Sequence, residues 1–366
     1  MSSCLLGAPV RFDGGHKRDT WLTDVLGHHV EWVPVCPEVE MGMPTPRETI
    51  RLEKRDGRIR LIAPRSGTDH TAVMQRYAER RVDELRREDL NGYVLKKDSP
   101  SCGVHRVLVH GETGAPEPSG RGLFAATLIE ALLHLPVEEE GRLADPELRD
   151  NFIERVFAYE RLQRLFGSKW TIGDLVAFHS EHKLTLMAHS RAHYGELGRL
   201  VADATKLDRT KLVAIYRRAF MAAMEVPTTR NKHTDVLMHM HGYVSDDLDH
   251  ASRHELLDLI EDYRKGRVPL RTPLALLAVM DSAAMYSALS PSSAPVQARL
   301  MLRMGFTCLR NIATVSGVPY DPDPMPDDPI ELSFEEFEGS MGRLEEMDFR
   351  SNVPPRRRGP ISWAGG

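Results

Sequence analysis

The feature that most constrains the fold is a change in hydrophobic pattern near Pro136. Before it, short apolar stretches alternate with longer amphipathic ones, and from Asp145 onward the long stretches have helical periodicity. Alternating strand and helix patterns are typical of an α/β layer fold, and uninterrupted helical patterns are typical of an all-α domain. The sequence therefore predicts an α/β N-terminal domain, with a small, largely parallel sheet and helices, followed by an all-α domain.

Individual elements can be assigned from the same patterns. Four apolar stretches of the first part are predicted as strands: HHVEWVPV, RIRLIAP, NGYVLKK and HRVLVHG. Helices are expected at TAVMQRYAERRVDELRRE and GLFAATLIEALLHL. In the second part, Asp145 and Pro146 fit the cap and first position of a helix. The stretch from Thr171 to Ala204 is predicted to be helical throughout.

The length of 366 residues fits two domains and a tail. We predict an α/β domain over residues 1–140 and a helical domain over 145–277. Residues 278–366, which contain VPYDPDPMPDDP, form an extension of open role that is partly linker-like. No run of about 18 apolar residues indicates a membrane span, and no secretion signal is evident, so a cytoplasmic location is expected.

Three of the four cysteines share an unusual context. Cys4 lies in SSCLLG, Cys36 in PVCPE and Cys102 in SPSCG, each among turn-forming residues. Cys36 and Cys102 follow predicted strands, where open α/β sheets build their sites. Three converging thiolates would suit an iron–sulfur cluster or zinc, whereas unrelated buried thiols are the alternative, because the spacing matches no short ligand motif. Cys308, in an apolar helical stretch, is expected to serve packing.

Longer motifs around these cysteines carry a resemblance. SSCLLGAPVRFDGGHK, VPVCPEVEMGMPTPRE and GYVLKKDSPSCG, in this order, resemble the TudS family of desulfidases. The later LVAFHSEHKLTLMAHSRAHYGELGRLVA and NKHTDVLMHMHGY resemble the helical, YbgA-like domain often fused behind it. Together, over about residues 1–275, they are similar to the RudS-type tRNA 4-thiouridine desulfidases.

This resemblance implies a [4Fe–4S] cluster held by Cys4, Cys36 and Cys102, with one iron left without a protein ligand. That iron would bind the thiocarbonyl sulfur of the substrate and act as a Lewis acid. Water would attack the ring carbon, and the sulfur would leave as hydrosulfide without net electron transfer. The implied reaction converts 4-thiouridine in tRNA to uridine.

Such chemistry needs a base for the water and a proton donor. The polar residues beside the cysteines are the candidates: first Glu38 and Ser101, then Asp13 and Lys96. A structural role is the alternative for each residue. Asp13 could only shape the RFDGG turn, and Lys96 could pair with a surface acid.

The second domain offers histidines that share one face of the predicted helix, namely His179, His182, His189 and His193. No HExxH pattern accompanies them, so packing at a helix–helix seam is favoured over a metal site. Cations and aromatic groups of this domain could contact RNA: Lys183, Arg191, Tyr194, Arg199, Arg217, Arg218, Lys232 and Tyr243. Solvated helix faces have a similar composition, but the resemblance assigns tRNA binding to this domain. The arginines at 356–358 are expected in a solvated tail.

Two other functions are considered. The first is a desulfidase of free thiouracil or another small thiolated pyrimidine or nucleotide, although such a substrate would not need a helical domain of this size. The second, of another class, is an RNA-binding adaptor whose cysteines hold a structural metal.

Overall fold

The computed structural model describes residues 1–111, 115–246, 248–277 and 280. Cys308, the arginines at 356–358 and, apart from Met280, the predicted extension from residue 278 lie outside the described residues. The expectations made for them therefore stay predictions.

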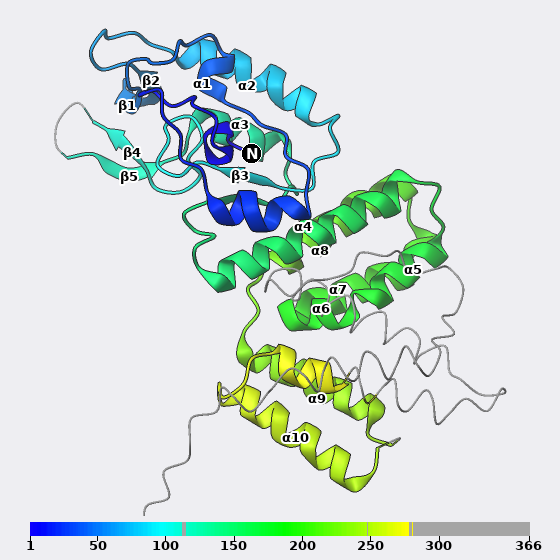
Figure 1. Cartoon of the computed structure of the whole chain (residues 1–366). Coiled ribbons are helices and arrows are strands. Elements are labelled where there is room, and N and C mark those ends of the chain that lie inside the picture. Colours follow the sequence, from blue (N-terminus) through cyan, green and yellow to red (C-terminus); the bar gives the residue numbers. More distant parts are fainter. Residues whose placement is uncertain (112–114, 247, 278–279, 281–366) are drawn as a thin grey trace, which may run out of the picture. The chain divides into compact units, whose positions relative to one another are not determined.

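The N-terminal region contains two small sheets (Figure 1). Its strands are β1 (Arg51–Arg55), β2 (Arg58–Ile62), β3 (Tyr93–Leu95), β4 (Val107–His110), β5 (Glu117–Gly120) and β6 (Val137–Glu139). The larger sheet has the order β2-β1-β4-β5, with β1 and β4 parallel and the outer pairs antiparallel, while β3 and β6 form a parallel pair. The predicted fold class is confirmed, with a mixed larger sheet. The mixture arises from hairpins, of which β1–β2 turns at Asp56 and Gly57, both with positive φ, as Asp-Gly hairpins do.

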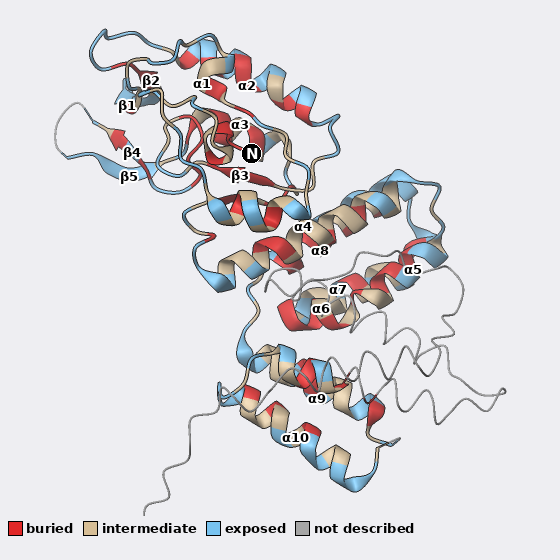
Figure 2. Cartoon of the chain, viewed as in Figure 1, coloured by how far each residue is buried: buried red, intermediate tan, exposed pale blue. Residues whose placement is uncertain are grey.

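Two helices, α2 (Thr71–Leu85) and α3 (Leu123–Ala131), bury the apolar face of these strands. The short helix α1 (Pro37–Glu40) packs against α2. Met74 and Tyr77 of α2 and Phe124 of α3 share one core with Leu52 of β1 and Leu95 of β3, and Figure 2 colours such buried residues red. Both long helices lie where the helical patterns predicted them.

The predicted strand HHVEWVPV is wrong as an extended element. Its start lies in the 3₁₀ turn η3 (Leu26–His28), and only Val35 pairs, in a parallel bridge to Ser2. Ser3 N–H donates to the Val35 carbonyl and Ser2 N–H to the Val94 carbonyl, each at 3.0 Å. The first residues therefore lie between the segment at Val35 and β3, as a minimal parallel strand would.

The second region is helical, as predicted. Its helices are α4 (Pro146–Gly167), α5 (Ile172–Glu181), α6 (Lys183–His189), α7 (Arg191–Ala202), α8 (Arg209–Glu225), α9 (Arg230–Val244) and α10 (His250–Arg264). The predicted cap is confirmed, because the Asp145 carboxylate accepts the N–H groups of Glu147 and Leu148, with Pro146 at the first helical position.

The continuous helix predicted from Thr171 to Ala204 is wrong. The backbone leaves helical geometry at His182 (φ −93°, ψ 6°) and at Ser190 (φ −156°, ψ 107°). Ser190 becomes an N-cap, because its hydroxyl accepts the N–H of His193. The four histidines therefore do not share one helix face, since they belong to three separate segments.

Helix α4 contributes to two cores. Phe152 and Ile153, near its start, pack in a cluster with Met1 and Leu22, whereas Leu162 packs with α5 and α8. The boundary predicted near residue 140 stays a prediction, and a cut there would separate Phe152 and Ile153 from their apolar neighbours. Among the described residues, no helix is long and apolar enough to cross a membrane.

Candidate active site

The three loop cysteines line one cavity of about 460 Å³ in the N-terminal region. Cys4 lies in the 3₁₀ turn η1 (Ser3–Leu6), and Cys36 follows the bridge residue Val35 directly. Cys102 lies in the loop that follows β3. The three thiols thus come from the carboxyl ends of neighbouring parallel segments, where such folds place their sites.

The Cys36 loop is held by α1, of which Cys36 is the N-cap. Its backbone N–H donates to Glu40 Oε1 at 2.7 Å, and Glu40 Oε2 accepts the Tyr77 hydroxyl at 2.6 Å. The backbone N–H groups of Glu38 and Val39 face the thiol and favour its thiolate. Cys36 is therefore fixed to α2 and given hydrogen-bond donors for a charged sulfur.

The Cys102 loop is a tight turn around Ser99. Ser99 Oγ accepts the N–H groups of Ser101 at 3.3 Å and Cys102 at 3.1 Å. Gly122, just before α3, approaches this turn so closely that a Cβ there would lie 2.4 Å from the Ser101 carbonyl carbon. Only glycine permits that approach, which presses Ser101 and Cys102 toward the cavity.

Burial controls the protonation of the thiols. Burial, aided by the neighbouring charge of Cys36, raises the pKa of Cys4 to about 11. Burial raises the pKa of Cys102 to about 12, against the Ser2 side chain, which lowers it. The pKa of Cys36 is also raised, mainly by burial. As free thiols all three are neutral at pH 7, so a bound metal centre would have to displace their protons.

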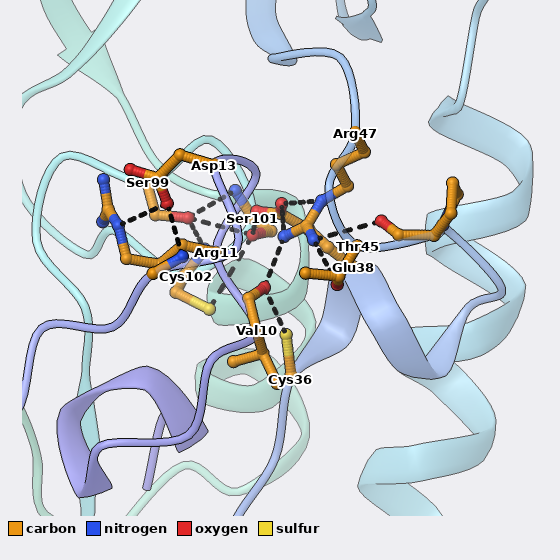
Figure 3. A network of polar contacts seen from close by, with 12 residues as sticks. Val10, Arg11, Asp13, Cys36, Glu38, Thr45, Arg47, Ser99, Ser101 and Cys102 are labelled. Carbon is orange, nitrogen blue, oxygen red and sulfur yellow. Dashed lines mark hydrogen bonds and ion pairs between the residues drawn. The ribbon is translucent and has the colours of Figure 1, made fainter.

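Glu38 and Ser101 meet directly, 63 residues apart in sequence. The Ser101 hydroxyl donates to Glu38 Oε1 at 2.7 Å, and Ser101 Oγ lies 3.8 Å from Cys102 Sγ. Figure 3 shows this network at the cavity, with Arg47 directed at Glu38. The structure thus brings together the two residues that the sequence put first.

Arg47 is the member of this network that the sequence analysis missed. Its Nε and Nη2 donate to Glu38 Oε2 at 2.9 and 2.5 Å, and Nη2 also donates to the Val10 carbonyl at 2.9 Å. Its side chain is only 4% exposed. The one available signal was its place in the PTPRE end of the second motif, where an arginine stands near Glu38 in sequence.

The other two candidates, Lys96 and Asp13, differ in their position relative to the cavity. Lys96 lines the cavity and forms an ion pair with Glu140, which is largely buried rather than on the surface. Asp13 does not line the cavity. Its half-exposed carboxylate accepts the N–H of Gly15 at 2.9 Å, as expected of a residue that shapes the turn.

The donor set of the cavity is three cysteine thiols. Within the part of the chain that the structure describes, no three His, Cys, Asp or Glu side chains are grouped to hold one metal ion. All three cysteine thiols line the same cavity. Soft sulfur donors are the ligands that iron–sulfur clusters take, so the chemistry of this donor set fits such a cluster.

The residues predicted to contact RNA do not form one group. Lys183 Nζ donates to the Tyr243 hydroxyl at 2.6 Å, and Arg191 forms an ion pair with Asp235 at 2.6 Å. Lys232 donates to the backbone carbonyls of His189 and Pro227.

The other predicted RNA contacts are scattered over α7 and α8. Tyr194 stacks on His179 in the helical core, with ring centroids 5.4 Å apart. Arg217 lies over Phe166, and Arg199 and Arg218 are exposed.

The histidines are packed at helix seams, as the sequence analysis favoured. His179, His182 and His189 are buried, and His193 is half-buried with its Nδ1 2.9 Å from Ser190 Oγ. His189 is fully buried, with Nδ1 2.7 Å from the Val226 carbonyl and Nε2 3.0 Å from Glu154 Oε2.

Two family models match the chain. Residues 1–140 match the model described as 2-thiouracil desulfurase, and residues 183–284 match the model described as protein of unknown function (DUF1722). The two matches cover the two regions separately.

Individual relatives match parts of the chain. The uncharacterized protein YbgA of Escherichia coli K12 is 36% identical over 126 residues, which are 34% of this chain and 75% of YbgA. The uncharacterized protein YbbK of Bacillus subtilis 168 is 28% identical over 145 residues, which are 38% of this chain and 95% of YbbK. A solved structure, the [4Fe-4S]-dependent thiouracil desulfidase TudS, is 34% identical and covers 39% of this chain and 90% of its own, with a TM-score of 0.33.

Proposed function

Since this chain belongs to the family of YbgA and its first 140 residues match 2-thiouracil desulfurase, we propose that it is a desulfidase that converts 4-thiouridine in tRNA to uridine. The observation that supports the proposal most is the hydrogen bond from Ser101 to Glu38 beside Cys102. It lies in a cavity that is lined by all three loop cysteines. We place the enzyme in the cytoplasm.

Cys4, Cys36 and Cys102 would hold a [4Fe–4S] cluster. When bound, the cluster would supply an iron with an open position that polarises the thiocarbonyl as a Lewis acid. The backbone N–H groups beside Cys36 would stabilise its sulfur and tune the centre.

Glu38 would be the general base. Its Oε2 accepts two hydrogen bonds from Arg47, which orient the carboxylate and leave Oε1 directed at Ser101. Water loses a proton to this carboxylate while its oxygen bonds to the ring carbon that carries sulfur. The carbon–sulfur bond then breaks and hydrosulfide leaves. The sum is C=S plus H₂O giving C=O plus H₂S, so no electrons are transferred.

Ser101 would carry the proton onward. Its hydroxyl lies 2.7 Å from Glu38 and 3.8 Å from Cys102 Sγ, between the base and the sulfur side of the cavity. It can return the proton from Glu38 to the departing sulfur or to the ring nitrogen. Lys96, held by Glu140, would donate a hydrogen bond to a pyrimidine oxygen. Asp13 would act only through the turn it shapes.

The tRNA half of the proposal rests on the helical region. It carries exposed cations such as Arg199 and Arg218, which phosphate recognition requires and a free base does not. A second candidate substrate, free 2-thiouracil, is favoured by one observation, the description of the matching family model. The same cavity would act on both substrates, so the two differ only in what the helical region contributes.

The test is turnover by anaerobically reconstituted protein. We expect thiolated tRNA to lose its 4-thiouridine absorbance. One hydrosulfide should be released for each 4-thiouridine converted, without added reductant. Free 2-thiouracil and 4-thiouridine are assayed in parallel. Turnover of the free compounds with unchanged tRNA would support the second candidate, and an iron-loaded protein inactive on all of them would contradict both.

A further inference from the structure

A shallow depression of about 550 Å³ lies on the helical region, apart from the cysteine cavity. Its lining includes Trp170 and, from the first half of α8, Arg209, Val213 and Arg217. It is thus basic at both ends and apolar between them. Neither Arg209 nor Trp170 was among the residues that the sequence suggested.

Aromatic rings hold both arginines. The Arg209 guanidinium lies 4.3 Å from the centre of the Trp170 ring and donates to the Trp170 carbonyl. The Arg217 guanidinium lies 5.4 Å from the centre of the Phe166 ring. Phe166 and Trp170 pack edge to face at 5.1 Å. Two guanidinium groups are therefore oriented by one aromatic pair.

Contact with an aromatic ring does not neutralise the positive charge of these two arginines. Elsewhere in the helical region arginines pair with carboxylates, as Arg191 does with Asp235 and Arg155 with Glu225. Within the described ranges, neither Arg209 nor Arg217 has such a partner, and the buried Nε of Arg217 has no hydrogen-bond partner at all.

Two acids close to the depression, Asp208 and Glu225, contact other groups. Asp208 caps α8 by accepting the N–H of Lys211 at 3.0 Å. Glu225, whose charge acts on His134 at the rim of the depression, pairs with Arg155. The exposed Arg218 adds a further cation beside Arg217. Among the described residues, the lining of the depression thus contains two arginines and no acidic side chain.

We propose that this depression binds the tRNA substrate outside its thiolated nucleotide, with an unpaired base stacked on the Arg209 guanidinium and a neighbouring phosphate on Arg217. The proposal rests on the proposed function and names the surface by which the helical region would hold the RNA. Unstacked bases pack on arginine planes and aromatic rings, and guanidinium forks bind phosphate oxygens. A guanidinium already fixed on Trp170 loses little freedom when a base covers its other face.

The test measures binding of unmodified tRNA to the full-length protein at several salt concentrations. Arg209→Gln and Arg217→Gln should each weaken binding about tenfold, as loss of one stacked base or phosphate contact does. The slope of log affinity against log salt should fall by about 0.7 to 0.9 per lost phosphate contact, which Arg217→Gln should show more than Arg209→Gln. Arg76→Gln, an exposed arginine on α2, is the charge-matched control and should bind like the wild type.

The outcomes separate this inference from the proposed function. If the double variant Arg209→Gln, Arg217→Gln binds tRNA with wild-type affinity and slope while thiolated tRNA is still processed, the depression is not the RNA site and the proposed function stands. If Arg76→Gln weakens binding as much, the effect is net charge and the inference fails. A wild-type protein that processes free 4-thiouridine but neither binds nor processes tRNA would overturn both.

Discussion

The two regions place their polar groups in opposite ways. In the N-terminal region, backbone turns bring Cys102, Ser101 and Glu38 from distant loops to one cavity. In the helical region, the His189–Glu154 ion pair lies in a seam between helices, while exposed cations such as Arg199 and Arg218 lie outside it. The cavity has the organisation that bond-breaking chemistry needs, and the cation-bearing helix surface has the organisation that polyanion binding needs.

The largest expected effect is on the cavity side. Cys4→Ala, Cys36→Ala or Cys102→Ala should abolish iron loading and turnover, because a cluster left with two protein ligands is labile. Iron content and visible absorbance after anaerobic reconstitution measure this. Cys308→Ala is the matched control and should load iron normally. Equal loss in that variant would mean that the three cavity cysteines are not the ligand set.

The next largest effect is a loss of turnover without a loss of iron, which separates the catalytic step from cluster binding. Glu38→Gln and Ser101→Ala should lower turnover by about 10²–10⁴-fold, the usual contribution of positioned proton transfer, while the protein keeps its iron. Steady-state rates with free 4-thiouridine, normalised to iron content, measure this. An iron-loaded Glu38→Gln protein with wild-type turnover would remove Glu38 from the mechanism, and a protein without iron would assign Glu38 a structural role.

Changes to the His189–Glu154 pair in the helical region should alter the stability of the protein rather than its turnover. Burial opposes charge on His189, but the Glu154 carboxylate outweighs it and raises the pKa of His189. Burial likewise opposes charge on Glu154, and His189 lowers the pKa of Glu154. The His189 contribution is full below pH 6.5 and is lost as pH rises through its raised pKa. The Glu154 contribution is full above pH 4.5 and is lost as pH falls through its lowered pKa.

The pair should therefore stabilise most between pH 4.5 and 6.5. Glu154→Ala should cost about 3 kcal/mol of unfolding free energy there, because it leaves His189 buried without its partner. Denaturant unfolding at several pH values measures this, with Glu154→Gln as the control that keeps an acceptor. A cost in Glu154→Ala that is the same at pH 5.5 and pH 8.5 would show that the ion pair does not contribute.

The smallest effect tests the break between α6 and α7. Ser190→Ala removes the cap that accepts the His193 N–H and should cost about 1 kcal/mol of stability. Thermal unfolding measures the loss, and iron loading of the cavity should not change. A variant as stable as the wild type would show that packing alone ends α6.

In both regions the sequence predicts what local patterns encode and misses what depends on contacts between distant segments. Turn-forming residues around Cys4, Cys36 and Cys102 are local signals, and the carboxyl ends of parallel segments meet at one sheet edge, so their gathering was predictable. Glu38 and Ser101 could be named because they adjoin these cysteines, but the contact between them was not predicted. Arg47 was missed because its contact depends on how the chain after α1 returns to the cavity, which no local pattern encodes.

In the helical region the local patterns predicted helices but not their interruptions. The break at Ser190 was unrecognised because a serine N-cap inside a helical pattern looks like one more polar position. The pairing of Arg209 with Trp170 spans 39 residues and joins the loop after α4 to the start of α8, so periodicity could not reveal it. β1, β5 and β6 were missed because each has at most one large apolar side chain and so lacks a strand pattern.

The most direct test of the account measures kcat/KM of full-length variants on both free 4-thiouridine and thiolated tRNA. Ser101→Ala should lose activity on both substrates by similar factors, because both react in the cavity. The Arg209→Gln, Arg217→Gln double variant should lose activity on tRNA alone and keep wild-type kcat/KM on the free nucleoside. Parallel losses on both substrates in the double variant, or loss on tRNA alone in Ser101→Ala, would contradict the assignment of chemistry to the cavity and RNA binding to the helical region.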